Sequence, residues 1–149
     1  KTKVVGTYVT RSKTVTKNAY GVSVGGTYIE ISIKQQHMWF YRNGKLYCHT
    51  DVVTGNADGY HNTPKGAFTV IQRQSPAVLV GADYSCPVSY WLGFTYGGVG
   101  IHDSSWRSNS EYGGNTYKGN GSHGCVNTPY SAVKKIYQKA GYGTRVVVY

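Results

Sequence analysis

Acidic residues are scarce in this sequence, which has 6 Asp and Glu against 16 Lys and Arg and a formal net charge of +10 at pH 7. Such an excess of positive charge attracts polyanionic partners. The basic residues are nevertheless scattered, and nowhere do five of them stand in a row. We therefore expect no nucleic-acid partner, and attribute the charge to general attraction to an anionic surface or to solubility alone.

Long apolar runs are also missing, since no segment approaches the roughly 18 residues that a membrane-spanning helix requires. No secretory leader is visible, and the sequence begins at Lys1 rather than at Met. We expect a mature or trimmed fragment of a longer precursor, because targeting segments are removed from mature proteins.

Cysteine is limited to Cys48, Cys86 and Cys125, and an odd number leaves at least one thiol unpaired. Cys48 lies in an apolar and aromatic run, where a buried structural thiol is usual. Cys86 precedes a proline. A disulfide between Cys48 and Cys86 is an alternative that the sequence leaves open.

Glycine and tyrosine are abundant, with 20 and 15 positions among 149 residues. Aromatic residues pack well on pleated sheets, and glycine adopts the turn conformations that other residues avoid. The chain is long enough for one domain with a core. The composition therefore predicts a mostly β domain rather than a disordered chain.

Alternating apolar residues and turn residues predict the order of the elements. Strands are expected at residues 28–33, 37–41, 45–53, 67–71, 90–101 (with a bend or bulge) and 144–149. One helix is expected, capped by Thr128 or Ser131 and ended by Gly141. Residues 103–121 form a long polar loop, and such loops are often functional. Residues 1–27 are expected to be an N-terminal strand or extension, or the tail of a preceding module, with the main domain at 28–149.

The hexapeptide from Ser122 to Asn127, S-H-G-C-V-N, bears the predicted chemistry. The thiolate is the reactive form of cysteine, so Cys125 needs a neighbour that accepts its proton. In extended backbone, residues i and i+2 face the same side, which places His123 beside Cys125. Amides near Gly124 would face a developing oxyanion, and the following helix would lower the thiol pKa.

His102 and Asp103 end a predicted strand upstream of this motif. His102 would be a second imidazole at the site, and Asp103 would accept a hydrogen bond from an imidazole and set its tautomer. A zinc site is the alternative, because His102, His123 and Cys125 are residue types that bind zinc. Neither C-x-x-C nor H-E-x-x-H accompanies them.

The motif from Ser122 to Asn127, preceded by His102, resembles the active-site signature of the L,D-transpeptidases, the YkuD domain family. The likeness runs from Tyr28 to Tyr149. It extends to Val53-Thr54-Gly55, Thr63 to Phe68, Tyr90-Trp91, Gly100 to Asp103, Trp106-Arg107 and Thr144 to Val148, and it is nearest to the Gram-positive branch. Nineteen residues separate His102 from Ser122, slightly more than is usual in the family.

The resemblance implies a β-sandwich-like fold of mixed sheets, with one main helix near the C-terminus. It implies a two-step acyl transfer in peptidoglycan biosynthesis, in which Cys125 attacks a tetrapeptide donor stem and releases D-Ala. The amine of an acceptor stem then resolves the thioester and forms a 3→3 cross-link. His123 would take the thiol proton, His102 would bind substrate or tune the thiolate, and Asp103 would orient His123.

The resemblance also implies supporting residues, partners and a location. Ser122, Gly124 and Asn127 would shape the motif and the oxyanion site. Substrate contacts are expected from Tyr90, Trp106 and Arg107. The implied enzyme is monomeric, needs no cofactor or metal, and is acylated by carbapenems. It would act outside the cytoplasm, secreted or associated with wall or membrane, where it supports cell shape.

Three other functions stay open at this point. The same Cys125 thioester would serve an L,D-carboxypeptidase if water resolves it, or an endopeptidase if the bond cleaved is an existing cross-link. A zinc hydrolase would use the same histidines as ligands. A non-catalytic wall-binding module would suit the basic charge and the many tyrosines.

Overall fold

The computed structural model describes residues 26–81 and 84–149, so the predicted element at 1–27 lies, apart from Gly26 and Thr27, outside the described residues. The strands are β1 (Tyr28–Ser32), β2 (His37–Arg42), β3 (Lys45–Asp51), β4 (Gly66–Thr69), β5 (Gln72–Gln74), β6 (Ala77–Val80), β7 (Ser85–Val88), β8 (Trp91–Gly93), β9 (Gly100–Asp103), β10 (Val126–Thr128) and β11 (Arg145–Val148). The helices are the 3-10 turn η2 (Asn109–Glu111), α1 (Thr116–Asn120) and α2 (Tyr130–Lys139).

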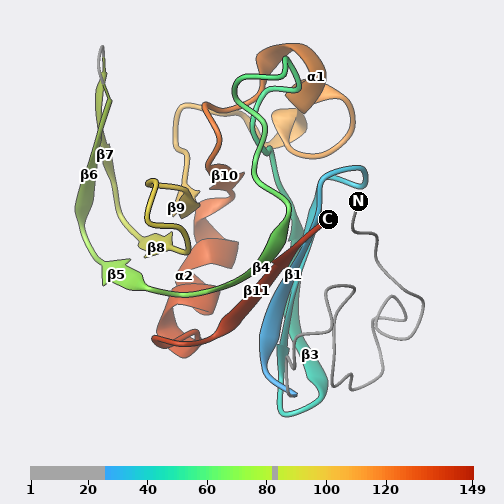
Figure 1. The fold of residues 1–149 in the computed structure, drawn as a ribbon, viewed down its shortest axis with the longest axis vertical. Helices are drawn as coiled ribbons and strands as arrows, with labels where there is room; N and C mark the ends of the chain where they lie inside the picture. Colours follow the sequence, from blue (N-terminus) through green and yellow to red (C-terminus); the bar gives the residue numbers. More distant parts are fainter. Residues whose placement is uncertain (1–25, 82–83) are drawn as a thin grey trace.

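The strands form two mixed sheets and a hairpin (Figure 1). The larger sheet has the order β3-β2-β1-β11-β4, the smaller one has the order β10-β9-β8-β5, and β6 pairs only with β7. β1 pairs with β11 and β9 with β10 in parallel, while the other pairs are antiparallel. This mostly β architecture with one main helix confirms the predicted fold class.

A single apolar core joins the two sheets to α2. Alternation along β1 turns Ile29 and Ile31 into this core, because successive strand side chains point to opposite faces. Tyr28 faces the other side of the sheet and packs with Trp39 and Tyr41. The remaining core members include Met38, Phe40, Val52, Val70, Leu92, Phe94, Ile101, Val126, Val133, Ile136, Ala140, Val146 and Val148.

Short elements account for most differences from the sequence prediction. Residues 90–101 form two antiparallel strands, β8 and β9, rather than one bent strand, and Gly98 in the intervening turn has φ +95. The sequence pattern predicted nothing for β5, β6 and β7, which have 3 or 4 residues each and are largely exposed. The predicted loop at 103–121 contains η2 and α1. The helix α2 begins directly after Pro129.

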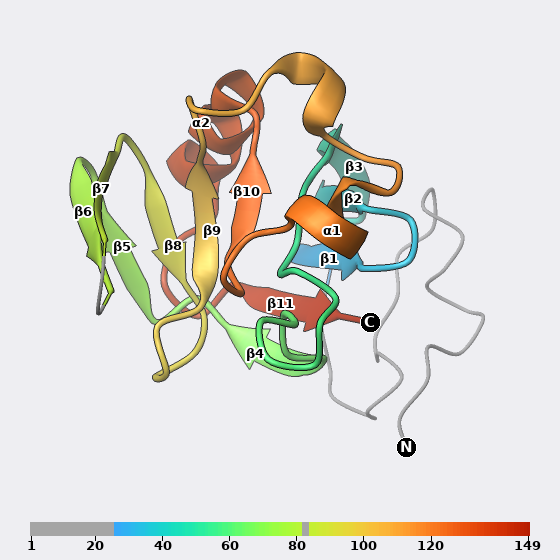
Figure 2. The same cartoon turned by 90° about the horizontal axis from the view of Figure 1, so that it is seen from above.

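The β6–β7 hairpin projects from the smaller sheet at the edge farthest from the larger one (Figure 2). Ala77 of β6 and Val88 of β7 are paired in register and are buried against Trp91 of β8. Leu79 and Cys125 pack against the same cluster. The inner face of the hairpin therefore lies over the cysteine of the S-H-G-C-V-N motif. The helices of the described ranges are short, and none is long and apolar enough to cross a membrane.

Candidate active site

Parallel pairing of β9 with β10 assembles the centre of the site. In this register His102 pairs with Asn127 and Ile101 with Val126. Cys125 immediately precedes β10, so it lies next to the start of β9, and its thiol donates to the Gly98 carbonyl at 3.5 Å. His102 and Asn127, which are 25 positions apart in the sequence, thus come into contact because their two strands are hydrogen-bonded to each other.

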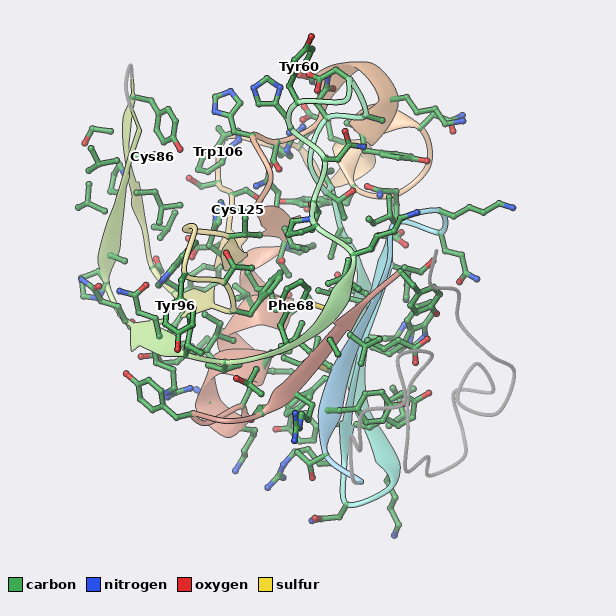
Figure 3. The ribbon with its side chains drawn as sticks, in the orientation of Figure 1. Tyr60, Phe68, Cys86, Tyr96, Trp106 and Cys125 are labelled. Atoms are coloured by element: carbon green, nitrogen blue, oxygen red, sulfur yellow. The ribbon has the colours of Figure 1, made fainter. Side chains whose placement is uncertain are left out.

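A cavity of about 790 Å³ opens above this junction. His102, His123, Cys125 and Asn127 all line it, so the structure brings the two predicted imidazoles and the predicted nucleophile to one space. The hairpin forms one wall, and Figure 3 shows Cys125 between the hairpin and the body of the domain. Among the described residues that line it are also the predicted substrate contacts Trp106 and Arg107.

Cys125 is partly buried, and this burial raises the pKa of its thiol above the usual 9.0, a shift that a hydrogen bond from the Gly100 amide opposes. Desolvation acts in this direction because it disfavours the charged thiolate. The resting thiol is therefore neutral at neutral pH. A nucleophilic role for Cys125 requires a base that accepts the proton as attack proceeds.

His102 is a buried imidazole with a defined tautomer. Its Nδ1 lies 2.7 Å from the Asp103 carbonyl oxygen, which can only accept, so Nδ1 carries the hydrogen. The unprotonated Nε2 lies 3.4 Å from Nδ2 of Asn127. Burial lowers the pKa of His102 below 6.5, more strongly than hydrogen bonding to Asp103 raises it. His102 is therefore a neutral imidazole whose Nε2 lone pair faces the Asn127 amide in the cavity, and this neutral form can accept a proton.

The side chain of Asn127 links His102 to a buried cation. Its Oδ1 accepts a hydrogen bond from Nε of Arg107 at 2.8 Å, which turns Nδ2 toward His102. The Arg107 side chain is only 5% exposed, and its Nη1 pairs with Glu111 at 3.1 Å. The guanidinium predicted to contact substrate therefore already holds Asn127 and the 109–111 turn in place.

His123 occupies a different position from the one that extended backbone predicts. Residues 123–125 form a bend, and Gly124 has φ +134, a conformation that side-chain-bearing residues rarely adopt. The His123 side chain is exposed. Its ring contacts those of His61 and Tyr84, each with a centroid distance of 5.3 Å. The extended backbone on which the prediction of a His123–Cys125 pair rested is thus absent at residues 123–125, although both residues line the cavity.

Asp103 and Tyr90 also differ from their predicted placement. Both carboxylate oxygens of the buried Asp103 accept from the Ser89 amide, and Oδ1 also accepts from the Tyr90 amide at 2.8 Å. The carboxylate therefore holds the turn before β8, and the carbonyl of Asp103, rather than its side chain, bonds an imidazole. Tyr90 is absent from the described residues that line the cavity, and its ring packs against Tyr130 and Tyr137 of α2.

Two hydroxyl groups hold the backbone of the motif. The buried Thr63 donates to the Gly124 carbonyl at 2.6 Å and accepts from the Gly55 amide at 2.8 Å. Ser122 Oγ donates to the Cys125 carbonyl and accepts from the Gly124 amide at 3.1 Å. The Gly124 amide, one of the predicted oxyanion donors, is therefore already engaged.

The loop at 55–63 folds so closely on itself that glycine is required at position 55. A Cβ atom on Gly55 would be 1.7 Å from the His61 carbonyl oxygen, a distance that no real contact tolerates. The Asn56 amide bonds the Ser122 carbonyl at 2.8 Å. The loop and the motif thus behave as one unit.

Sequence reasoning missed several residues of the site. The side chains of Thr63, Tyr84 and Trp91 were assigned no role. The ring of Trp91 stacks on that of His102, with 5.9 Å between the two ring centroids. Cys86 also lines the cavity. The disulfide between Cys48 and Cys86, which the sequence left open, does not form in the structure, where all three cysteines are free thiols. The segments that resembled the family, Thr63 to Phe68 and Tyr90-Trp91, were the available signs for Thr63 and Trp91, but nothing local marked Tyr84 or Cys86.

The zinc alternative depends on a cluster of ligating side chains. Across residues 26–81 and 84–149, no group of three or more His, Cys, Asp or Glu residues is placed to hold a metal ion. In addition, Nδ1 of His102 already donates to a carbonyl, so only Nε2 would be available.

Comparisons with known proteins agree with one another. Residues 26–148 match the YkuD family, described as the L,D-transpeptidase catalytic domain. A cysteine-to-serine mutant of the Enterococcus faecium L,D-transpeptidase superposes with a TM-score of 0.79 at 42% identity, over 85% of this chain and 50% of that one. The E. faecium catalytic domain acylated by ertapenem gives 0.74 at 43%, over 83% and 97%.

A more distant structure, an L,D-transpeptidase from Mycobacterium smegmatis, shares the fold with a TM-score of 0.72 at 21% identity, over 83% of this chain and 58% of that one. No curated protein sequence matches significantly. The chain spans about half the length of the E. faecium mutant chain.

Replacing Thr63 by Val tests the coupling between the loop and the motif. The substitution keeps the shape of the side chain but leaves the Gly55 amide and the Gly124 carbonyl buried without their partner. We expect the free energy of unfolding in urea to fall by about 1–3 kcal/mol, and the rate of iodoacetamide labelling of Cys125 to change. Thr63→Ser keeps the hydroxyl and should behave nearly as the parent does. Equal stability of the Val and Ser variants would contradict the bridging role.

Proposed function

The chain belongs to the YkuD family of L,D-transpeptidase catalytic domains, and from this premise we propose that it cross-links peptidoglycan stems through a thioester on Cys125. The main support is one observation: the neutral thiol of Cys125 and the neutral, tautomer-defined imidazole of His102 share one cavity. A neutral pair of this kind is suited to base-assisted nucleophilic attack.

In the first step, the Cys125 sulfur bonds to the carbonyl carbon of the third residue of a tetrapeptide donor stem. The thiol proton passes to Nε2 of His102, and the hydrogen bond from Nδ1 to the Asp103 carbonyl stabilises the resulting imidazolium. His102 then protonates the amine of the departing D-Ala. The geometry favours His102 over the predicted His123 as base, because His123 is exposed and its ring makes tilted contacts with the rings of His61 and Tyr84.

The tetrahedral oxyanion needs a donor in the same cavity. Because the Gly124 amide bonds Ser122 Oγ, the amide of Cys125 itself is the proposed donor. A preorganised backbone amide stabilises the charge that develops in the transition state without reorganising at that moment. The bonds made by Ser122 and Thr63 hold this amide in place.

In the second step, the side-chain amine of an acceptor stem attacks the thioester carbonyl. His102 takes a proton from this amine, and the thiol of Cys125 is restored as the new amide forms. The outcome is a 3→3 cross-link. Trp106, which is 51% exposed at the cavity, is the proposed apolar contact for a stem peptide, while Arg107 acts through Asn127.

Partners and location are proposed from the same premise. A domain that shares 43% identity with this chain is acylated by ertapenem, which supports carbapenems as covalent inhibitors of this chain. A peptidoglycan substrate supports action outside the cytoplasm, in the wall or near the membrane. We propose that the domain acts as a monomer on donor and acceptor stems.

The product of the reaction tests this function directly. Incubation with a disaccharide-tetrapeptide should release D-Ala and give a dimer detectable by mass spectrometry, because an acceptor amine resolves the thioester. Cys125→Ala should give neither product, whereas Cys86→Ser, which changes the other thiol of the cavity, should give both. A tripeptide monomer as the sole product would assign an L,D-carboxypeptidase instead, and cleavage of a supplied cross-linked dimer would assign an endopeptidase.

The pH dependence tests the assignment of the base. His102 must be neutral to accept a proton, and burial lowers its pKa, so kcat/KM for D-Ala release should rise with pH, with the midpoint of the rise below pH 6.5. The value of kcat/KM should then stay level through the neutral range, because the Cys125 thiol, whose pKa is raised above 9.0, stays protonated there.

The variant His102→Gln lacks the base, so its remaining activity should rise only toward alkaline pH, as the thiol itself ionises. His123→Gln is the matched variant on the other imidazole and should keep the acidic limb. Loss of that limb in His123→Gln, with its retention in His102→Gln, would reverse the assignment.

A further inference from the structure

Three aromatic rings form a row at the wall of the cavity. The ring of His123 lies between those of His61 and Tyr84, with centroid distances of 5.3 Å and interplanar angles of 36° and 49°. We call these three residues the ring ladder. Tyr84 and His123 line the cavity, whereas His61 stands behind His123 on the loop at 55–63. The ladder therefore connects the hairpin to the body of the domain through His123.

The His61 end of the ladder is held rigidly. Nδ1 of His61 donates to the Asp58 carboxylate at 2.6 Å. Asp58 also accepts from the amides of Tyr60 and His61, each at 2.8 Å, and its pKa is held far below the usual range, first by the hydrogen bond from His61. Because the loop is bonded to the motif through Asn56 and Ser122, the ring of His61 is a fixed support for His123.

The Tyr84 end belongs to the hairpin itself. The Gly81 amide donates to the Tyr84 carbonyl at 2.9 Å, and a Cβ atom on Gly81 would lie 2.1 Å from the Tyr84 ring. The Tyr84 ring thus lies in the space that a side chain at position 81 would occupy, and this position orients the ring toward His123. Near its base the same hairpin packs on the Cys125 cluster through Ala77 and Val88.

We infer that His123 is a positioning residue that latches the hairpin over Cys125 by ring contact, and that the ladder sets how tightly the donor stem is held. This inference rests on the proposed function. Aromatic pairs contribute beyond area burial by amounts that correspond to roughly 2- to 12-fold in an equilibrium constant. A latch of this strength closes the cavity over a bound stem and still opens for an acceptor.

Replacing His123 by an aromatic residue that has no titratable nitrogen distinguishes a role as a latch from a role in proton transfer. For D-Ala release from a tetrapeptide donor, His123→Ala should raise KM about 10-fold and change kcat little, because a weakened latch holds the stem less tightly. His123→Phe should restore KM to within about 3-fold of the parent, because it keeps the ring contact. His49→Ala, which removes an exposed ring that contacts His37 on β2, is the matched control and should change neither constant.

A double-mutant cycle tests the contact with Tyr84. If the two rings act as one latch, Tyr84→Leu combined with His123→Ala should raise KM no further than His123→Ala alone. An inactive His123→Phe variant would overturn the inference, and so would effects of the two substitutions on KM that multiply.

A second readout keeps the inference separate from the proposed function. The rate at which a bulky maleimide labels Cys125, measured in a Cys86→Ser background, should rise several-fold when either ring is removed. It should rise no further when both are removed. Absence of D-Ala release by the parent protein would contradict the proposed function, whereas labelling rates unaffected by Tyr84→Leu and His123→Ala would overturn the latch.

Discussion

The parallel register between β9 and β10 is the constraint on which the site depends. It places Asn127 opposite His102 and brings Cys125 beside the first residue of β9. Backbone hydrogen bonds of two adjacent strands, supported by a core that includes Ile101 and Val126, determine these positions. Groups built on strands are held more accurately than groups on loops, and catalytic geometry requires that accuracy.

Burial of the site explains its electrostatics. Desolvation moves the thiol pKa of Cys125 upward and the imidazole pKa of His102 downward, so both groups are neutral at rest. Hydrogen bonds offset part of each shift without changing its direction. The arrangement differs from a preformed thiolate–imidazolium pair, and in the proposed mechanism charge appears only as the substrate is attacked. The contacts from Arg107 to Asn127 and from Asn127 to His102 orient the imidazole that is the proposed base.

Much of the fold followed from local pattern, and the nucleophile motif could be identified from its residues. Strands β1 to β4 were predicted within a few residues, and the helix α2 was predicted close to its start at Tyr130. The resemblance to a family, rather than periodicity, supplied the mixed-sheet architecture. The hairpin strands β6 and β7 escaped prediction because short, exposed strands carry little alternation.

The roles of individual side chains were harder to predict, because they depend on backbone conformation and on distant partners. Gly124 has a positive φ and residues 123–125 form a bend, so the extended backbone from which the placement of His123 was predicted is not present. Asp103 serves the turn at Ser89 and Tyr90, a contact across 13 or 14 residues that no motif indicates.

The central claim, that Cys125 is the acyl-accepting nucleophile of this cavity, is tested most directly by intact-protein mass spectrometry after incubation with ertapenem. The account predicts the addition of one drug molecule, located on the peptide that contains Cys125, absent from Cys125→Ala and present in Cys86→Ser. An unmodified mass, or an adduct that survives Cys125→Ala, would contradict it.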